Sequence, residues 1–527
     1  MARTQLARQI GAMFAERDGA RGLSRRAFLA RGTALGVGAL ALGSLPAVAS
    51  AAAQRIVIVG AGISGLAAAL ALQDKGITAT VYEANRRVGG RMFSTVPGSY
   101  WAAGQVSEWG GELIDTDHTV IQGLAQRFAL PLDDLHAAMP AGATDTYRFR
   151  DHYYPYAQAK TDFEPVYAAL QKDLDSFDYP VTYDSGASPA GIALSNMTAY
   201  DWIESRVPGG HRSLFGQLLD VAYNIEFGAQ TTAQTALGLI GLLGYQAAPG
   251  DFDMFGTSDE RYHIRGGNQQ LPKAIAAALP PDAISFGWQL TALAVNADHT
   301  QTLTFAVNGG TRTVTADHTI LAVPLGVMKR IDFSRAGFDA RKRATYAAMP
   351  MGVNGKLQLQ FESRLWNQTG AWPGVSTGES YADTGYQNTW DVSRAQPGTP
   401  GILVDFLGGD VARSFTPGHA FGSADDPVIS GYARRFLGQI EPVYPGLSAL
   451  WNGKALLSTW YLNPYSYGSY SYWPTRYCQN YAGYEGVRQG NVHFAGEHCS
   501  VDYQGYMEGG AEEGQRAAAE IIADLGR

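Results

Sequence analysis

The chain has 527 residues, of which 46% are hydrophobic and 17% are charged. This length suffices for two or more domains and for a core that encloses a large ligand, which excludes a small binding module. The formal net charge is -8, so no excess of positive charge is available for nucleic acid, and a nucleic-acid-binding function is excluded as a first interpretation.

The first fifty residues have the pattern of an export signal. Arg25 and Arg26 stand before a charge-free run, residues 32–54, that contains many small residues. This is typical of a twin-arginine signal cleaved after Ala49 or Ala51, and an uncleaved membrane anchor is the alternative. We expect residues 1–51 to be removed, no stable membrane anchor to remain, and the protein to be periplasmic or secreted. Because this route carries folded proteins, a cofactor inserted before export is expected.

Residues 55–59, RIVIV, predict a short buried strand, and an alanine- and leucine-rich helix pattern follows a glycine-rich turn. A second strand, residues 77–83, ends in Glu83, an acid placed to accept hydrogen bonds from ribose hydroxyls. This order of elements predicts a dinucleotide-binding unit, in which the glycines let the backbone approach a pyrophosphate at the helix N-terminus. The predicted contacts in this unit are Gly60, Gly62, Ile63, Ser64, Gly65, Glu83 and Ala84. At this point both NAD and FAD remain open.

The segment after Glu83 contains Arg-x-Gly-Gly-Arg, residues 87–91. An acid followed by this segment resembles the FAD-binding flavoprotein amine oxidases of the monoamine and polyamine oxidase type. The resemblance implies FAD as the cofactor, bound in part by Gly90 and Arg91, with the Arg91 guanidinium at the pyrophosphate.

The resemblance extends along most of the chain. Residues 109–114, WGGELI, resemble the family's glycine segment beside the isoalloxazine, and the closing signature is represented by residues 492–497 and 505–510. A helix that starts near Met507 is expected to direct its N-terminus at the flavin. These matches imply further FAD contacts at Gly110, Gly111, Glu112, Leu290, Gly496, Glu497, Gly505, Tyr506 and Met507.

The implied fold class is α/β: a Rossmann-like FAD-binding domain interleaved with an α+β substrate domain, the amine oxidase or glutathione reductase-type FAD fold. The FAD domain is expected to comprise residues 54–130, 252–336 and 455–527. Residues 131–251 and 337–454 are expected to form the substrate domain, with helices in the first insert and strands in the second.

Residues 355–361, GKLQLQF, alternate in polarity, which predicts a strand with Leu357 and Leu359 on one face and Lys356 on the other. Periodicity leaves Lys356 facing either solvent or a wet cavity. The resemblance identifies Lys356, ten positions before Trp366, as the lysine that holds a water near flavin N5 and assists oxygen reactivity.

Residues 466–473, SYGSYSYW, have the spacing of an aromatic strand. The resemblance implies instead that Tyr470 and Tyr506 form an aromatic cage that guides an amine to the flavin. Serine stands at position 469, where monoamine oxidases carry the cysteine that binds flavin covalently, so noncovalent FAD is expected. Tyr467, Tyr472 and Trp473 are expected to serve packing.

The expected reaction is hydride transfer from the carbon beside the amine nitrogen to flavin N5, giving an imine and then an aldehyde, with O2 reduced to H2O2. Lys356, Tyr470 and Tyr506 are the expected catalytic residues. Tyr223, Glu226 and Phe227 are expected to line the substrate pocket with Glu112. The specific amine stays open, and the resemblance allows a homodimer.

Two alternatives share the fold: an L-amino-acid oxidase, and an amine dehydrogenase that passes electrons to a periplasmic redox protein. A substrate carboxylate requires a cation such as arginine, and Leu113 stands where many amino-acid oxidases carry one. Glu112 would repel a carboxylate if it points into the pocket; otherwise its backbone contacts the flavin. A carotenoid-type desaturase and a non-catalytic flavin-binding protein are weaker alternatives.

No metal is expected, because the set His493, His498, Cys499 and Asp502 lacks the ligand spacing of known metal sites. Whether Cys478 and Cys499 pair stays open.

Overall fold

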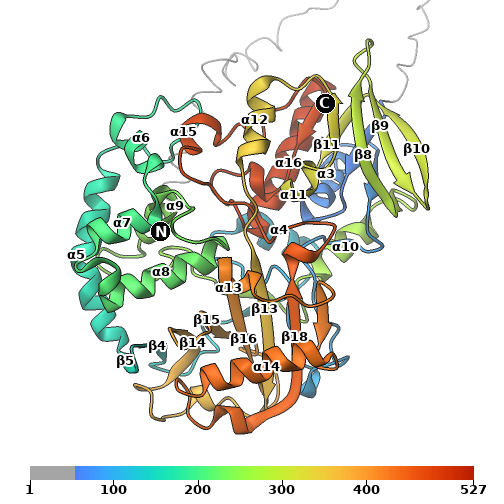
Figure 1. The fold of residues 1–527 in the computed structure, drawn as a ribbon. Coiled ribbons are helices and arrows are strands. Elements are labelled where there is room, and N and C mark those ends of the chain that lie inside the picture. Colours follow the sequence, from blue (N-terminus) through green and yellow to red (C-terminus); the bar gives the residue numbers. More distant parts are fainter. Residues whose placement is uncertain (1–53) are drawn as a thin grey trace, which may run out of the picture. The chain divides into compact units, whose positions relative to one another are not determined.

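A five-stranded parallel sheet carries the predicted nucleotide-binding unit (Figure 1). In this computed structural model, which describes residues 54–527, the strand order is β19 (Val492–Phe494), β11 (His318–Leu321), β1 (Ile56–Val59), β2 (Ala79–Glu83) and β7 (Ile284–Phe286). Every residue of β1 is buried, as its β-branched run predicts. The two strands predicted around the glycine turn are therefore confirmed, whereas the predicted export signal lies outside the described residues.

Helices from opposite ends of the described chain cover this sheet together. α3 (Ile63–Gln73) lies against α16 (Met507–Asp524), the blue and red helices of Figure 1. The contact is so close that a Cβ on Gly514 would meet the Ser64 carbonyl oxygen at 2.1 Å. α4 (Thr119–Arg127) and α10 (Gln270–Ala278) pack beside this pair. The C-terminal helix thus completes the layer that the N-terminal glycine turn begins.

A mixed eight-stranded sheet forms the second large layer. Its order is β17 (Phe421–Ser423), β18 (Trp451–Thr459), β13 (Asn354–Phe361), β16 (Gly401–Gly408), β15 (Asn388–Asp391), β14 (Ser376–Ala382), β4 (Thr144–Phe149) and β5 (His152–Tyr154). Helix α14 (Pro427–Ile440) packs on β18 and β13. The strands predicted in the second substrate insert, around residues 356–361 and 401–407, are confirmed by β13 and β16.

The first substrate insert contains the predicted helices, and its strands β4 and β5 also join the eight-stranded sheet. Its helices, drawn in teal and green in Figure 1, are α5 (Tyr156–Leu174), α6 (Pro189–Asn196), α7 (Ala199–Arg206), α8 (Leu214–Phe227) and α9 (Ala236–Leu243). Helix α8 contacts β16, β14 and β15, so its C-terminal end lies over the eight-stranded sheet. Among the described helices, none combines the length and the apolar character that crossing a bilayer requires.

The remaining elements are short. A four-stranded sheet has the order β10 (Gly310–Ala316), β9 (Gln301–Val307), β8 (Trp288–Val295) and β12 (Asp332–Arg335), and β3 (Leu132–Asp134) pairs with β6 (Tyr262–Ile264). Short helices are α11 (Leu325–Met328), α12 (Ala340–Ala348), α13 (Gly409–Arg413) and α15 (Cys478–Tyr481). Because residues Arg55–Arg527 form one compact unit, the boundaries between the two interleaved domains stay a prediction.

Candidate functional site

A cavity of about 310 Å³ extends between the parallel sheet and the eight-stranded sheet. We call its wall formed by the glycine turn, the end of β2 and the start of α16 the cofactor side. We call its wall formed by the end of α8 and by β13, β14, β15 and β16, together with Glu260, the substrate side. Of the residues predicted to bind the cofactor or substrate or to act in catalysis, all line this cavity except Gly65 and Tyr223.

The glycine turn between β1 and α3 leaves room at one position and none at two others. A Cβ on Gly60 would lie 2.5 Å from the Ala322 carbonyl oxygen, and one on Gly65 would lie 1.9 Å from the Gly60 carbonyl oxygen. Gly62 lines the cavity, and a Cβ there would meet no protein atom within 4 Å. Gly60 and Gly65 therefore allow the close packing of backbone, whereas the space beside Gly62 is free for a ligand.

The start of α3 has the unsatisfied polar groups that a pyrophosphate would satisfy. No side chain caps the helix N-terminus, and the buried Ser64 hydroxyl has no hydrogen-bond partner among the described residues. Helix N-terminal amides and a free hydroxyl bind phosphate well because the helix dipole favours an anion there. This part of the cavity thus fits the expected FAD.

Glu83 ends β2 and supports the glycine turn. Its carboxylate accepts hydrogen bonds from the amides of Ala61 and Asn85, both at 2.7 Å. Burial raises the pKa of Glu83, and these amides partly oppose that rise because they favour the charged form. Glu83 lines the cavity, so its contact with a ribose stays a prediction beside this structural role.

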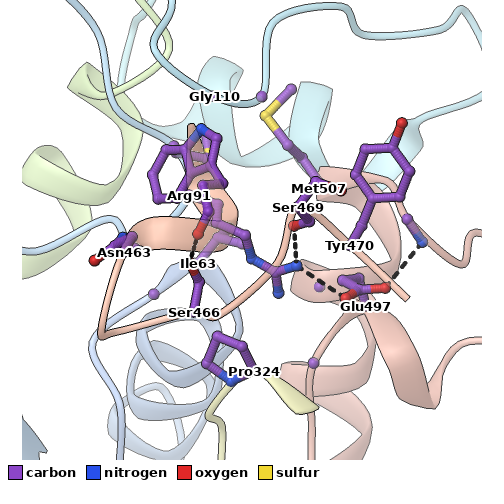
Figure 2. Close-up of a pocket in the computed structure, with 18 of the residues that line it drawn as sticks. Ile63, Arg91, Gly110, Pro324, Asn463, Ser466, Ser469, Tyr470, Glu497 and Met507 are labelled. Atoms are coloured by element: carbon purple, nitrogen blue, oxygen red, sulfur yellow. Dashed lines mark hydrogen bonds and ion pairs between the residues drawn. The ribbon is translucent and has the colours of Figure 1, made fainter. Parts of the chain in front are cut away.

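Arg91 is held by two partners at the cofactor side (Figure 2). Its Nη1 donates to the Ser469 carbonyl oxygen at 2.7 Å and to Glu497 Oε1 at 2.9 Å. Glu497 also accepts from the Ser471 hydroxyl at 2.8 Å and the Gly505 amide at 3.1 Å. Burial opposes the charge of Glu497, but Arg91 and these hydrogen bonds outweigh it and leave its pKa below the usual value. The segments around residues 91, 470 and 500, which are distant in the sequence, therefore meet at the ion pair between Arg91 and Glu497.

Helix α16 begins at Met507, which confirms the predicted helix start. No side chain caps its N-terminus, and Met507 lies in the cavity wall. A Cβ on Gly111 would lie 2.8 Å from the Met507 sulfur, and one on Gly110 would lie 2.0 Å from the Arg91 carbonyl oxygen. These glycines allow the second glycine segment to pass close to the helix start, where a helix dipole stabilises negative charge on a ligand.

Lys356 lies on the polar face of β13, as alternation predicts, but that face does not meet bulk solvent. The segment around residues 102–112 covers it: Gln358 Nε2 donates to the Glu108 carbonyl oxygen at 3.0 Å. Lys356 is only 7% exposed, and its Nζ donates to the Gly110 carbonyl oxygen at 2.9 Å and to Glu112 Oε2 at 2.6 Å. The alternative of a wet cavity therefore describes this lysine better than bulk solvent.

Glu112 is paired within the cavity wall. In addition to Lys356, it accepts from Trp390 Nε1 at 2.9 Å. Burial would raise the pKa of Glu112, but the Lys356 ammonium and these hydrogen bonds outweigh burial and lower it. The expectation that Glu112 itself repels a substrate carboxylate is thereby corrected, because its charge is already compensated by Lys356.

Tyr470 and Tyr506 both line the cavity and approach Glu226. The Tyr470 hydroxyl donates to the Glu226 carbonyl oxygen at 2.5 Å, and the Tyr506 hydroxyl lies 3.5 Å from Glu226 Oε1 and 3.1 Å from the Ser258 hydroxyl. Burial raises the pKa of Tyr470, so it stays a neutral phenol. Residues 466–473 form turns rather than an aromatic strand, which is how a single segment brings Tyr470 to the cavity.

The neighbours of Tyr470 have other tasks. Ser469 lines the cavity and donates to Asn354 Oδ1 at 2.6 Å, and a serine has no thiolate for a covalent flavin link. Arg330 stacks over the Tyr467 ring at 3.5 Å, and Tyr472 and Trp473 are buried. Packing is thus the observed role of these three aromatic residues.

Tyr223 does not line the cavity, which corrects the expectation for this residue. Its side chain is fully buried, and its hydroxyl donates to the Met254 carbonyl oxygen at 3.2 Å. Phe227, one helical turn later in α8, stacks on Tyr223 with ring centroids 6.3 Å apart and itself lines the cavity. Helical periodicity places both on one face but does not tell which of them the cavity reaches.

The substrate side contains carboxylates that sequence patterns did not single out. Glu260 and Glu379 line the cavity with Glu226. Glu260 has a left-handed backbone, φ 46°, and burial raises its pKa well above the usual value. Glu379 accepts from the Tyr381 hydroxyl at 2.9 Å, and burial together with the nearby Asp145 raises its pKa to about 8. The positive φ at position 260 has no single-residue signal in the sequence.

Few cations face these carboxylates. The lysines and arginines among the described lining residues are Arg87, Arg91 and Lys356, of which the first two belong to the cofactor side. Arg394 interacts electrostatically with Glu260 and Glu379 but is buried outside the lining and donates to the Asp391 carbonyl oxygen. Asn388, Trp390 and Phe406 complete the substrate side and were also missed, because they follow strand patterns typical of any core.

The cysteines and the histidine cluster lie outside this cavity. Cys478 and Cys499 are buried free thiols, so they do not pair. Two other groups in the described part of the chain bring three ligand atoms together: His318 with His493 and Asp524, and Asp115 with Asp117 and His118. His493 is already hydrogen-bonded to Glu520 at 2.6 Å, and the absence of a metal stays a prediction.

Comparisons with known proteins agree with this geometry. The family model described as flavin containing amine oxidoreductase matches residues 63–522. An L-amino-acid oxidase of Mus musculus is 23% identical over 90% of this chain and 71% of that protein. A flavin-containing amine oxidase of Danio rerio is 22% identical over 91% of this chain and 87% of that protein.

A cyclohexylamine oxidase from Brevibacterium oxydans IH-35A shares the fold, with a TM-score of 0.73, 24% identity, and coverage of 90% of this chain and 100% of that one. The predicted α/β FAD fold is thereby confirmed. Because the family model spans most of the chain, and because the glycine turn, the Ser64 hydroxyl and the start of α16 fit its cofactor, this protein belongs to the flavin-containing amine oxidoreductases and uses FAD.

Proposed function

We propose that this enzyme oxidises a cationic amine rather than an amino acid. The observation that carries the proposal is the set of carboxyl groups on the substrate side, where Glu226, Glu260 and Glu379 line the cavity and none of the described lining residues of that side is an arginine. An ammonium group stabilises the ionised form of these carboxyl groups and pairs with it, whereas an α-carboxylate would disfavour that ionisation and would find no bidentate donor on this side.

The side chains of the cavity have separate tasks in this proposal. FAD, when bound, supplies the acceptor for a hydride from the carbon beside the amine nitrogen. Tyr470 and Tyr506 orient the amine, since electron-rich rings attract an ammonium by cation–π interaction. Phe227, Trp390 and Phe406 exclude water, which favours the neutral amine that the reaction consumes. No protein nucleophile is required.

L-Amino-acid oxidation is the second candidate, supported by the similarity to the mouse L-amino-acid oxidase. Its carboxylate would need Lys356 or Arg394 as a partner. Lys356 is already paired with Glu112, and Arg394 is only 8% exposed behind the lining. The amine is therefore the better-supported substrate class.

We also propose O2 as the electron acceptor, with H2O2 as product, and export by the twin-arginine route. The sequence of residues 24–29, SRRAFL, supports export. Fractionation of cells that express the chain with Arg25 and Arg26 both changed to lysine tests it, because a twin-arginine substrate should then stay inside the cell.

The decisive experiment is anaerobic mixing of the purified yellow protein with monoamines, diamines and L-amino acids in parallel, followed by admission of air. We expect amines to bleach the flavin absorbance and air to restore it with release of H2O2. Bleaching by amino acids alone would contradict the proposal, and bleaching by amines with slow recovery in air would replace O2 by a protein acceptor.

A further inference from the structure

Lys356 and Glu112 form a buried ion pair in the wall of the cavity. Both side chains line the cavity, and both are nearly buried, with Lys356 7% and Glu112 8% exposed. Their closest atoms are 2.6 Å apart. A buried pair of this geometry is strongly coupled, because removing one partner leaves the other uncompensated in a low-dielectric site.

Each oxygen of the Glu112 carboxylate has its own donor. Oε2 accepts from Lys356 Nζ, and Oε1 accepts from Trp390 Nε1 at 2.9 Å. The indole ring of Trp390 also lies 5.2 Å from Lys356 Nζ, within reach of a cation–π interaction. The carboxylate and the indole therefore fix the ammonium from two directions.

The other fixed contact of Lys356 is with the cofactor side. Its Nζ donates to the carbonyl oxygen of Gly110 at 2.9 Å, and Gly110 belongs to the glycine segment that passes the start of α16. The ammonium is thus held against the backbone that is expected to run beside the flavin.

We propose that Glu112 is a positioning residue: together with Trp390 it holds the Lys356 side chain in one place against the Gly110 backbone, and it acts in reoxidation rather than in binding the amine. In reoxidation, O2 takes two electrons and two protons and leaves as H2O2. The negative charge that develops on oxygen is stabilised by a fixed cation nearby. This inference rests on the proposed amine oxidation.

A double-mutant cycle on the flavin-loaded enzyme tests the coupling, with Glu112→Gln, Lys356→Met and the double variant. We expect each single variant to slow reoxidation by air at least about ten-fold, while flavin reduction by the amine changes much less. The double variant should be no slower than Lys356→Met alone, because Glu112 acts through the lysine. Trp390→Phe removes only the Nε1–H donor and should slow the same step by about two- to three-fold.

The rival role for Glu112 is recognition of the substrate ammonium. In that case Glu112→Gln would weaken amine binding even in the Lys356→Met background. The Glu112→Gln single variant would then be reoxidised at the wild-type rate. Either result, or faster reoxidation in Glu112→Gln, overturns the proposal. Asp74→Asn is the matched control, since it removes a carboxylate from an exposed pair with Arg127 away from the cavity.

The same double-mutant cycle can be measured through thermal stability, without substrate turnover. In the flavin-free protein, we expect each single variant to lower the thermal unfolding midpoint and the double variant to recover part of the loss, since neither charge is then left unpaired. If no amine reduces the flavin, the proposed function fails, and this thermal cycle still decides whether the two residues are coupled. Additive thermal losses would contradict the coupling.

Discussion

The two sides of the cavity are built by different means. The cofactor side consists of backbone, glycines and compensated charges: Arg91 meets Glu497, and the Glu83 carboxylate binds two amides. On the substrate side, the lining cation Lys356 is already paired with Glu112, and the cation that interacts with Glu260 and Glu379, Arg394, lies behind the described lining residues. A cofactor that stays bound requires a preformed site, whereas a transient cationic substrate can itself supply the missing charge. The difference implies that mutations on the two sides should affect separate observables.

The largest effect is expected in the glycine turn. Gly65→Ala would place a Cβ 1.9 Å from the Gly60 carbonyl oxygen, so we expect a loss of stability of about 3 kcal/mol or more and protein purified without flavin. Gly62→Ala meets no protein atom within 4 Å and should keep the fold while losing flavin. The ratio of flavin to protein absorbance and the thermal midpoint of the flavin-free form distinguish the two.

Gly123→Ala serves as the control for both glycine variants, because this exposed position in α4 has no atom within 4 Å of an added Cβ. It should leave flavin content unchanged. Normal flavin content in Gly62→Ala would mean that the cavity beside the turn does not hold the cofactor.

On the substrate side, Glu260→Gln and Glu379→Gln should each raise the KM for a cationic amine by about ten-fold, since each removes a carboxyl group that can ionise and pair with the bound ammonium. Flavin content and the rate of reoxidation should stay close to wild type. Steady-state kinetics with the best amine measures the first effect, and absorbance measures the second. Loss of flavin in either variant would contradict the assignment of separate roles to the two sides of the cavity.

The pH dependence of KM sharpens the same contrast. Because the pKa of Glu379 is raised to about 8, this carboxyl is mostly neutral at pH 7 and ionises as the pH rises through 8. Amines of ordinary basicity remain cationic in that range, so KM should fall between about pH 7 and pH 9. Glu379→Gln should flatten this fall, and a KM that rises over this range in the wild type would argue against ionic recognition.

The smallest effect is expected at Tyr223, which packs behind Phe227. Tyr223→Phe removes one hydrogen bond to the Met254 carbonyl oxygen and should cost about 1 kcal/mol of stability with no change in KM. Denaturant unfolding and steady-state kinetics test this together. A changed KM would mean that Tyr223 contributes to substrate binding after all.

Local sequence patterns predicted the cofactor side well. The β1 strand, the glycine turn, the α3 helix and the acid at the end of β2 follow one another within about thirty residues, so local pattern and steric demand specify their arrangement. The start of α16 at Met507 was predictable for a similar reason, since its motif is contiguous. The chain's membership of its family follows from these local signatures.

The partners of the residues on the substrate side depend on tertiary packing and could not be predicted from local patterns. Alternation along β13 gave the face of Lys356, but the residue that covers this face, Glu112, is 244 positions away in the chain. Helical period grouped Tyr223 with Phe227, yet only Phe227 of the two lines the cavity, where it is joined by Glu260 and Glu379 from separate segments. Periodicity reports the direction of a side chain relative to its own backbone, whereas burial and charge pairing depend on which distant segment packs against it.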